Sequence, residues 1–261
     1  MTELYYSLAG ALVGFLVGMT GVGGGSLMAP ILVLGFGFAP ALAVGTDLWF
    51  ATLTKCVGGI VHRRFGSPDW KIIGRLALGS VPAAVLTLLY LGFADGGKVN
   101  PALLMKLLGA MLLLTAVIVP VKHIIHAPVN RIRALLGDRL VMVQWIATIV
   151  AGAAVGCLVT LTSIGAGALV AVVLMLLYPL RMNAKSLVGT DIVHAIPLAL
   201  IAAIGHSWLG NVDWHLLGLL LIGSVPGVIA GSFAAGRVSE TWVRLALSAM
   251  LAFSGIKMLI A

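Results

Sequence analysis

This sequence is poor in charged residues and in groups that support enzymatic chemistry. Only 9% of its 261 residues are charged and only eight are acidic, whereas about 25% of a soluble domain is charged. The two cysteines, Cys56 and Cys157, lie in apolar runs and lack the spacing of a metal site or a disulfide framework. Zinc-binding helix motifs, nucleophile elbows and clustered Cys/His ligands are missing as well. We therefore expect no enzyme, no metal and no cofactor.

Apolar residues fill the sequence instead. They make up 61% of the chain, and they recur in runs of roughly 20 residues, the length that crosses about 30 Å of hydrocarbon. Examples are Ile72–Phe93, Ala102–Val121 and Val141–Leu161. The short alternating pattern of an outer-membrane barrel is absent, and Met1–Tyr5 lacks the positive start of a cleaved signal peptide. The sequence predicts an all-α polytopic membrane protein.

The chain also contains an internal repeat. Three motifs return about 144 residues later: Gly45–Asp47 as Gly189–Asp191, Asp69-Trp70 as Asp213-Trp214, and Gly79–Pro82 as Gly223–Pro226. The glycine-rich stretch Thr20–Gly25 aligns with Thr162–Gly167 after a two-residue shift. We expect one repeat over residues 1–121, a basic cytoplasmic linker over 122–139 and a second repeat over 140–261. A duplicated half in an apolar chain is typical of secondary transporters, which bind substrate at the repeat interface.

Each repeat is predicted to contain five helical segments, of which the first two form a hairpin broken by glycine. The segments are Leu4–Met19, Leu27–Phe36, Leu42–Val61, Lys71–Phe93 and Ala102–Val121, then Leu140–Leu161, Ala168–Tyr178, Ala184–Ile204, Trp214–Ala235 and Thr241–Ile260. A helix of about ten residues is about 15 Å long, half a membrane. Such a hairpin contributes an even number of membrane crossings whether it re-enters or spans. The three further spans therefore give each repeat an odd number of crossings. The second repeat is therefore expected to have inverted topology.

The distribution of Lys and Arg supports this topology. With residues 122–139 in the cytoplasm, twelve basic residues lie on that side and three, Lys98, Lys106 and Lys257, on the other. The segment Arg63–Lys71 is basic, while its counterpart Ser207–Asp213 contains no Lys or Arg. By the positive-inside rule, the protein lies in the inner membrane with both termini extracytoplasmic. The net charge of +8 is thus explained by topology, and we expect the lipid bilayer as a partner and no nucleic acid. The oligomeric state stays open, a homodimer included.

The two glycine breaks are the predicted anion-binding segments. A phosphate loop is excluded because no strand precedes the first break and no Lys-Ser/Thr pair follows it. Unwound backbone between two half-helices would instead offer N–H groups to an anion. The expected ligands are Gly23, Gly24, Gly25 and Ser26 in the first repeat and Gly165, Ala166 and Gly167 in the second. Close helix packing through small residues is the alternative.

Ionisable and hydroxyl residues near these breaks are further candidates. Lys55 is the one basic residue deep in a predicted span. It binds the anion, forms a structural ion pair with Asp47 or Asp191, or extends along the helix toward Arg63. Both acids either clamp the hairpins or couple transport to a proton or cation. His194 shares a helix face with Asp191, as a buried structural residue or a proton carrier.

The duplicated tripeptides supply two more predicted ligands. Thr46 and Thr190 are expected to contact the substrate. By contrast, Asp69-Trp70 and Asp213-Trp214 are expected to be structural, since Asp caps helices and Trp prefers the membrane interface.

These motifs together resemble the TauE/SafE family of membrane proteins. The resemblance is carried by Gly21–Gly25, Gly45–Asp47 and His62–Trp70, extends over nearly the whole chain and appears in both halves. It implies an exporter of sulfite or organosulfonates, or a permease for related sulfur anions. Asp47 and Asp191 stand where Ser or Asn is common in the family, so two acids beside an anion path require a compensating cation, a proton or distance.

The sequence therefore predicts a secondary transporter that exports sulfite or a short organosulfonate by alternating access. One alternative is an importer of sulfate, thiosulfate or a carboxylate, coupled to protons or a cation. Another is a membrane scaffold or assembly factor without cargo.

Overall fold

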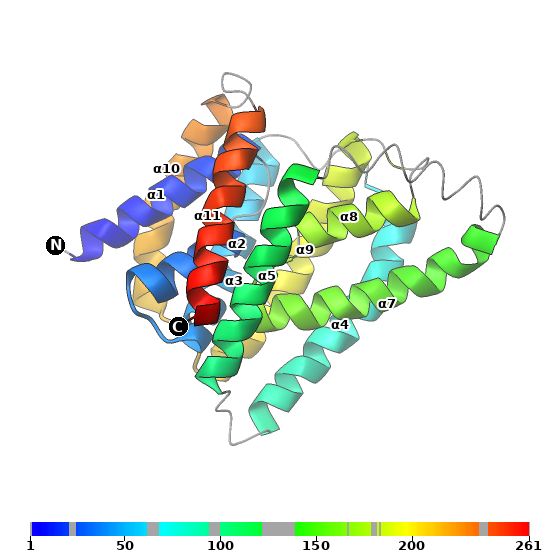
Figure 1. The fold of residues 1–261 in the computed structure, drawn as a ribbon, viewed down its shortest axis with the longest axis horizontal. Helices are drawn as coiled ribbons and strands as arrows, with labels where there is room; N and C mark the ends of the chain where they lie inside the picture. Colours follow the sequence, from blue (N-terminus) through cyan, green and yellow to red (C-terminus); the bar gives the residue numbers. More distant parts are fainter. Residues whose placement is uncertain are drawn as a thin grey trace.

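The protein is a bundle of helices. The computed structural model describes residues 2–20, 25–61, 68–93, 100–121, 139–165, 167–178, 182, 184–234 and 240–260, and all regular elements in these ranges are helical (Figure 1). The first half contains α1 (Thr2–Thr20), α2 (Gly25–Pro30), the π-helical η1 (Ile31–Gly35), α3 (Pro40–Val61), α4 (Trp70–Phe93) and α5 (Pro101–Val121). The second half contains α7 (Arg139–Thr162), α8 (Ala168–Leu177), α9 (Ala184–Trp208), α10 (Trp214–Ala234) and α11 (Glu240–Ile260). The predicted all-α fold and its helical segments are confirmed.

One predicted segment differs from expectation in its geometry. The sequence predicts a single helix over Leu27–Phe36, but the structure divides it into α2 and the π-helical η1 at Pro30. Proline has no N–H to donate to the preceding turn, so the regular hydrogen-bond ladder is interrupted there.

The helices have the lengths expected of a multi-pass membrane protein. Among the described residues, seven helices are long and apolar enough to cross a membrane: α1, α4, α5, α7, α9, α10 and α11. The short arms after the glycine breaks are confirmed, since α8 has 10 residues and α2 has 6, followed by the 5 of η1. The 22-residue helix α3 is not among the seven. It carries Asp47, Lys55 and several buried threonines, which makes it the polar helix of the interior.

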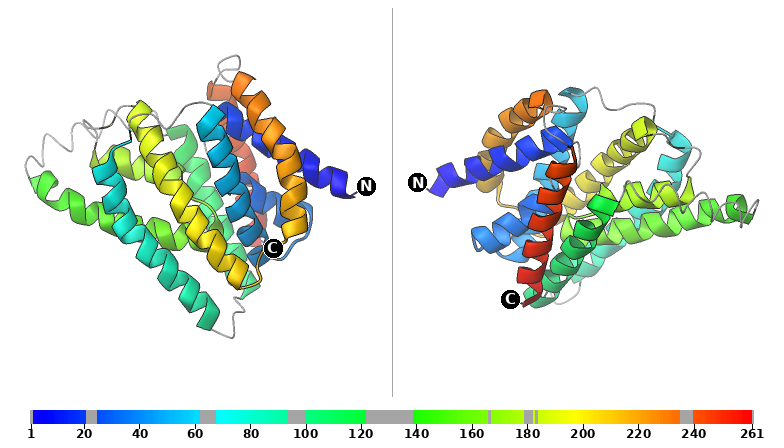
Figure 2. Two further views of the ribbon diagram at one scale, coloured as in Figure 1. Left: turned by 180° about the vertical axis from the view of Figure 1, so that it is seen from behind. Right: turned by 45° about the horizontal axis from the view of Figure 1, so that its top comes forward.

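Each half packs mainly on the other half. Helix α1 lies along α10, α4 along α7, α5 against α11 and α3 against α9 (Figures 1 and 2). In every pair, one helix comes from each half. The first arm of each glycine-broken hairpin therefore packs more on the opposite half than on its own second arm. The central pair α3 and α9 also contacts α10 and α4, respectively.

Glycine spacing allows these close helix contacts. On α1, a Cβ added to Gly10 or Gly14 would collide with the backbone of Leu220 or Ser224 on α10. On α7, a Cβ added to Gly152 or Gly156 would collide with the backbone of α4 at the two positions equivalent to these, Leu76 and Ser80. Small residues four apart let two backbones approach closely, as in membrane helix dimers. The contact of α1 in the first half with α10 in the second is thus matched by the contact of α7 in the second half with α4 in the first.

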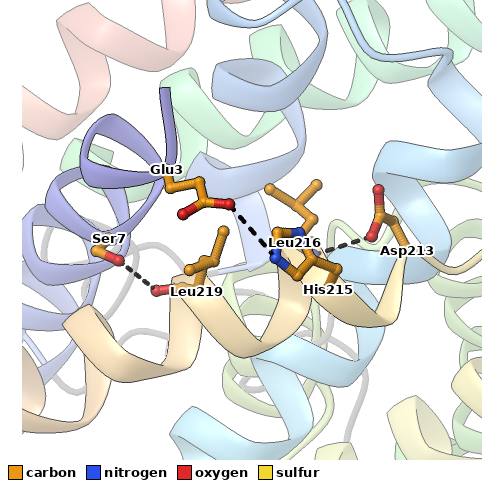
Figure 3. Close-up of polar contacts among 6 residues, drawn as sticks. All are labelled: Glu3, Ser7, Asp213, His215, Leu216 and Leu219. Atoms are coloured by element: carbon orange, nitrogen blue, oxygen red, sulfur yellow. Dashed lines mark hydrogen bonds and ion pairs between the residues drawn. The ribbon is translucent and has the colours of Figure 1, made fainter. Parts of the chain in front are cut away.

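Polar contacts also connect α1 to α10. The Ser7 hydroxyl donates to the Leu219 carbonyl at 3.0 Å, and Glu3 lies 3.6 Å from the His215 imidazole (Figure 3). Since both members of the Glu3–His215 pair are more than half exposed, this pair contributes little to stability. The glycine contacts therefore position α1 more than the ion pair does.

The two Asp-Trp motifs begin helices as predicted. Helix α4 starts at Trp70, and the Asp69 carboxylate accepts a hydrogen bond from the Ile72 N–H at 3.3 Å. Helix α10 starts at Trp214, and the Asp213 carboxylate accepts one from the Leu216 N–H at 2.9 Å (Figure 3). Such caps satisfy N–H groups that lack a partner within the helix.

Candidate functional site

Four ionisable residues of the interior lie where α3 packs against α9. Lys55 follows Asp47 by about two turns of α3 and so lies near the same face. It is within electrostatic reach of Asp47 and of Asp191 and His194 on α9. Asp47 is fully buried, His194 and Lys55 are at least nine-tenths buried, and Asp191 is half-buried. The structure thus brings together all four ionisable candidates identified from the sequence.

The Asp47 carboxylate lies between the two hairpins. The backbone of Ala29 in α2 and the side chain of Ser163, directly after α7, lie against it. Among the described residues, however, neither carboxylate oxygen forms a hydrogen bond of standard geometry, and neither does the Ser163 hydroxyl. Because unsatisfied buried polar atoms are rare in native proteins, this group is a candidate for ligand or proton binding.

The break in the second half has a special backbone conformation. Helix α7 ends at Thr162, after which Ser163 and Gly165 adopt positive φ values of 58° and 114°. The Thr162 hydroxyl accepts a hydrogen bond from the Ile164 N–H at 3.2 Å and so stabilises the turn. The φ of Gly165 is one that residues with a side chain rarely adopt, and an added Cβ would also lie 2.9 Å from the end of the Leu169 side chain, which would have to shift. The predicted break in the helix is therefore present here.

Helix α8 begins next to this turn without a side-chain cap. Gly167 precedes the helix and provides no capping hydrogen bond. The first N–H groups of a helix have no partner within it and carry partial positive charge, so they can face an anion.

The first break is described only in part. Gly25 and Ser26 lie in the first turn of α2. Gly23 and Gly24, like Ala166 in the second half, lie outside the described residues.

The two threonines of the duplicated tripeptides connect the halves. The Thr46 hydroxyl accepts a hydrogen bond from the Asp213 N–H at 3.1 Å, and the Thr190 hydroxyl accepts one from the Asp69 N–H at 3.0 Å. Both threonines are fully buried. Each therefore anchors the start of the capped helix in the opposite half. Substrate contact by these two residues stays a prediction.

Hydrogen bonds to the two buried histidines involve residues that the sequence did not single out. His194 Nε2 lies 2.9 Å from the Ser80 hydroxyl, and His206 Nε2 lies 2.9 Å from the Thr160 carbonyl. Ser80 belongs to the duplicated Gly79–Pro82 motif, and Ser163 belongs to the aligned glycine break. Repetition of Ser80 as Ser224 was a signal that could have identified Ser80, whereas Ser163 corresponds to Gly21 and carried no such signal.

Metal ligation finds no support in the described part of the chain, where no group of three or more His, Cys, Asp or Glu side chains is placed to hold an ion. The site combines one buried cation, two acids and uncapped backbone N–H groups. Such a set can bind a small anion by charge and hydrogen bonding.

Comparison with known proteins agrees with this description. Residues 6–258 match the family described as "Sulfite exporter TauE/SafE". The chain belongs to the TauE/SafE family. It is 36% identical over 257 residues to the "Probable membrane transporter protein YjnA" of Bacillus subtilis (strain 168), with 97% of this chain and 98% of that protein covered.

Two further relatives cover similar lengths. The "Probable membrane transporter protein YdhB" of the same Bacillus is 26% identical over 95% of this chain and 96% of its own. The "Probable membrane transporter protein MJ0441" of Methanocaldococcus jannaschii is 25% identical over 97% of this chain and 94% of its own. No solved structure matches the chain. The TauE/SafE resemblance noted in the sequence is therefore confirmed.

Proposed function

We propose that this TauE/SafE protein is a secondary transporter that exports sulfite or a short organosulfonate by alternating access at the interface of its two halves. The family description and the names of the relatives support a membrane transporter. The family description also supports sulfite as substrate and export as direction.

The observation that carries the proposal is the position of Lys55. Its side chain is 9% exposed and lies between α3 and α9, beside both acids of the duplicated tripeptides. A buried cation in a membrane protein is costly and by default marks a substrate pathway. In this proposal the Lys55 ammonium balances the negative charge of the anion, and N–H groups near Gly165 and Gly167 donate hydrogen bonds to the anion. Gly23–Ser26 form the equivalent donors of the first half in this proposal.

The proposed membrane topology is inverted between the halves. It is supported by the uneven distribution of Lys and Arg and by helix contacts that repeat with the halves exchanged. In this arrangement the protein lies in the inner membrane with both termini extracytoplasmic.

A second candidate function is import of sulfate, thiosulfate or a carboxylate together with a proton or cation. It is favoured by Asp47, Asp191 and His194, which lie within reach of the same lysine. A scaffold without cargo would need neither a buried lysine nor a broken helix at the interface.

Counterflow in proteoliposomes tests the proposal. Labelled sulfite, sulfoacetate and taurine would be offered to the wild type, to Lys55→Met and to the control Lys106→Met, which removes an exposed lysine of α5. A charge-assisted hydrogen bond contributes about 1.5–3 kcal/mol, so Lys55→Met should raise the dissociation constant about 10- to 150-fold. The control should behave as wild type. Absence of flux for all three compounds in the wild type would favour a scaffold without cargo. Unchanged affinity in Lys55→Met would show that Lys55 does not bind the substrate.

A further inference from the structure

The two acids of the duplicated tripeptides have different surroundings. Asp47 is fully buried, whereas its counterpart Asp191 is half-buried. Within the described ranges, both oxygens of Asp47 lack a hydrogen bond of standard geometry, and so does the Ser163 hydroxyl that lies against them. Three unsatisfied polar atoms therefore meet at one point of the interior, between the two hairpins.

We propose that Asp47 binds the proton that accompanies the anion, so that protonation of its carboxylate allows an anion to bind beside Lys55. This inference rests on the proposed transport of an anion. It assigns the coupling ion and distinguishes between two acids that the repeat makes equivalent.

Charge balance in the interior is the first argument. Lys55 already lies within electrostatic reach of two carboxylates. An anion bound beside this lysine would add another negative charge where water is excluded, and the cost of an uncompensated buried charge is high. One proton on Asp47 restores the charge that the site has before the anion arrives. The proton and the anion then bind together or leave together.

Hydrogen bonding is the second argument. An ionised carboxylate only accepts hydrogen bonds, whereas a protonated one has an O–H donor as well. In the protonated form, Asp47 can donate to the Ser163 hydroxyl, which has no other partner among the described residues. The Ser163 O–H can donate to the ionised carboxylate and its oxygen can accept from the protonated one, so this pair accommodates Asp47 in both protonation states.

The surroundings favour a proton over a metal cation. Hard metal cations such as sodium require a cage of oxygen ligands, but Asp47 faces the Ala29 backbone and the Lys55 ammonium. The titratable groups that face the pair come from α3 itself and from α9: Lys55, Asp191 and His194. In the described parts of the other helices packed against α3, the acids, lysines and histidines are at exposed positions, namely Glu3, Lys106 and His215. Helix α1 also carries the exposed Tyr5 and the partly buried Tyr6.

His194 is less suited than Asp47 to carry this proton. Its Nε2 is engaged with the Ser80 hydroxyl at 2.9 Å, while its Nδ1 has no hydrogen bond of standard geometry among the described residues. It also lies within reach of Lys55, and a second positive charge beside that lysine would be repelled.

Coupling to one proton changes which gradients drive transport. An anion of single charge that moves with one proton carries no net charge, so the membrane potential does not act on the pair. Export would then follow the anion gradient against the proton gradient, and an increase in external acidity would reverse it.

Titration calorimetry in two buffers of different ionisation enthalpy tests the inference on the full-length protein. Sulfite and ethanesulfonate serve as probes, because the sulfonate does not titrate near neutral pH. The wild type should take up a proton with each anion bound, and its affinity should fall about tenfold per pH unit once the free carboxyl is ionised. Asp47→Asn should bind the anion without proton uptake and without this pH dependence. Asp47→Glu should restore the proton uptake and the pH dependence. The control Glu3→Gln, which changes an exposed residue of α1, should match the wild type.

The possible outcomes separate this inference from the proposed function. Failure of the wild type to bind either anion overturns the proposed function, and the inference with it. Anion binding by the wild type without proton uptake overturns the inference alone, whether or not the Asp47 variants fold. Proton uptake that persists in Asp47→Asn but is lost in Asp191→Asn would overturn the assignment to Asp47.

Discussion

The two halves of this protein share a backbone arrangement but differ in the side chains at their centre. Gly79 and Gly223 occupy equivalent positions on α4 and α10, and each faces the backbone of the first helix of the opposite half. Yet Lys55 of the first half corresponds to Ala199, and His194 of the second corresponds to Phe50. The halves thus share these close backbone contacts, while the buried lysine of the first half has no counterpart in the second.

The same contrast appears at the ends of the short arms. Tyr178, after α8, accepts a hydrogen bond from the Arg75 guanidinium at 3.1 Å and lies 2.7 Å from the Thr148 hydroxyl. The equivalent contact in the first half is apolar, with Tyr6 and Phe36 packed edge to face at 4.8 Å between ring centroids. One short arm is therefore held by polar contacts and the other by aromatic packing.

Breaking the shared scaffold should have the largest effect. Gly79→Ala places a methyl group against the Ile149 carbonyl of α7, whereas at Gly74, on the same helix, an added Cβ meets nothing within 4 Å. Alanine favours a helix over glycine by about 1 kcal/mol, so Gly74→Ala should be neutral or stabilising. Gly79→Ala should cost about 3 kcal/mol, at the upper end of overpacking, because two backbones must separate. Melting temperatures of the purified variants measure the difference.

The pair Gly223→Ala and Gly218→Ala repeats this experiment on α10. Gly223 faces the Ser7 carbonyl of α1, and Gly218 again has open space. Equal losses of stability in Gly79→Ala and Gly223→Ala would support the same packing contact in both halves. A loss in one half only would show that the halves do not depend on the same contact.

Removing the two threonine hydrogen bonds between the halves should have the next largest effect on stability. Thr46→Val and Thr190→Val each remove the acceptor of a helix-start N–H in the other half. Leaving such a group unsatisfied costs about 1–3 kcal/mol, and the two losses should be similar. Thr115→Val is the control, because its hydroxyl bonds only to Met111 within its own helix. Loss of sulfite affinity without loss of stability would instead place these hydroxyls on the anion.

Much of this fold could be predicted from the sequence, and the reasons are local. Apolar runs and Asp caps determine where helices begin and end, so the starts of α4 and α10 at Trp70 and Trp214 were predictable. The packing of α1 on α10 was not, because glycine spacing indicates a contact surface without naming its partner. The role of Thr46 was missed for the same reason, since its partner Asp213 is 167 residues away. Buried polar pairs across a duplicated chain depend on the three-dimensional arrangement of the halves.

The smallest expected effect comes from making the two halves more alike at their centre. His194→Phe places in α9 the residue that α3 already has at the equivalent position, Phe50, which is fully buried. The change leaves the Ser80 hydroxyl without its histidine partner, and the equivalent hydroxyl of Ser224 already lacks a partner among the described residues. A serine in a helix can bond to a carbonyl of its own preceding turn, so the loss should be limited to about 1 kcal/mol.

A double-mutant cycle with Ser80→Ala measures this interaction directly. Removal of the serine should cost stability in the wild type and little in His194→Phe, because the two side chains bond to each other. Anion binding and its coupled proton uptake should persist in His194→Phe, since the charge of Lys55 and the carboxylate of Asp47 are unchanged. Loss of proton uptake at unchanged stability would instead make His194 the proton carrier, and the asymmetry between His194 and Phe50 would then be part of the coupling mechanism.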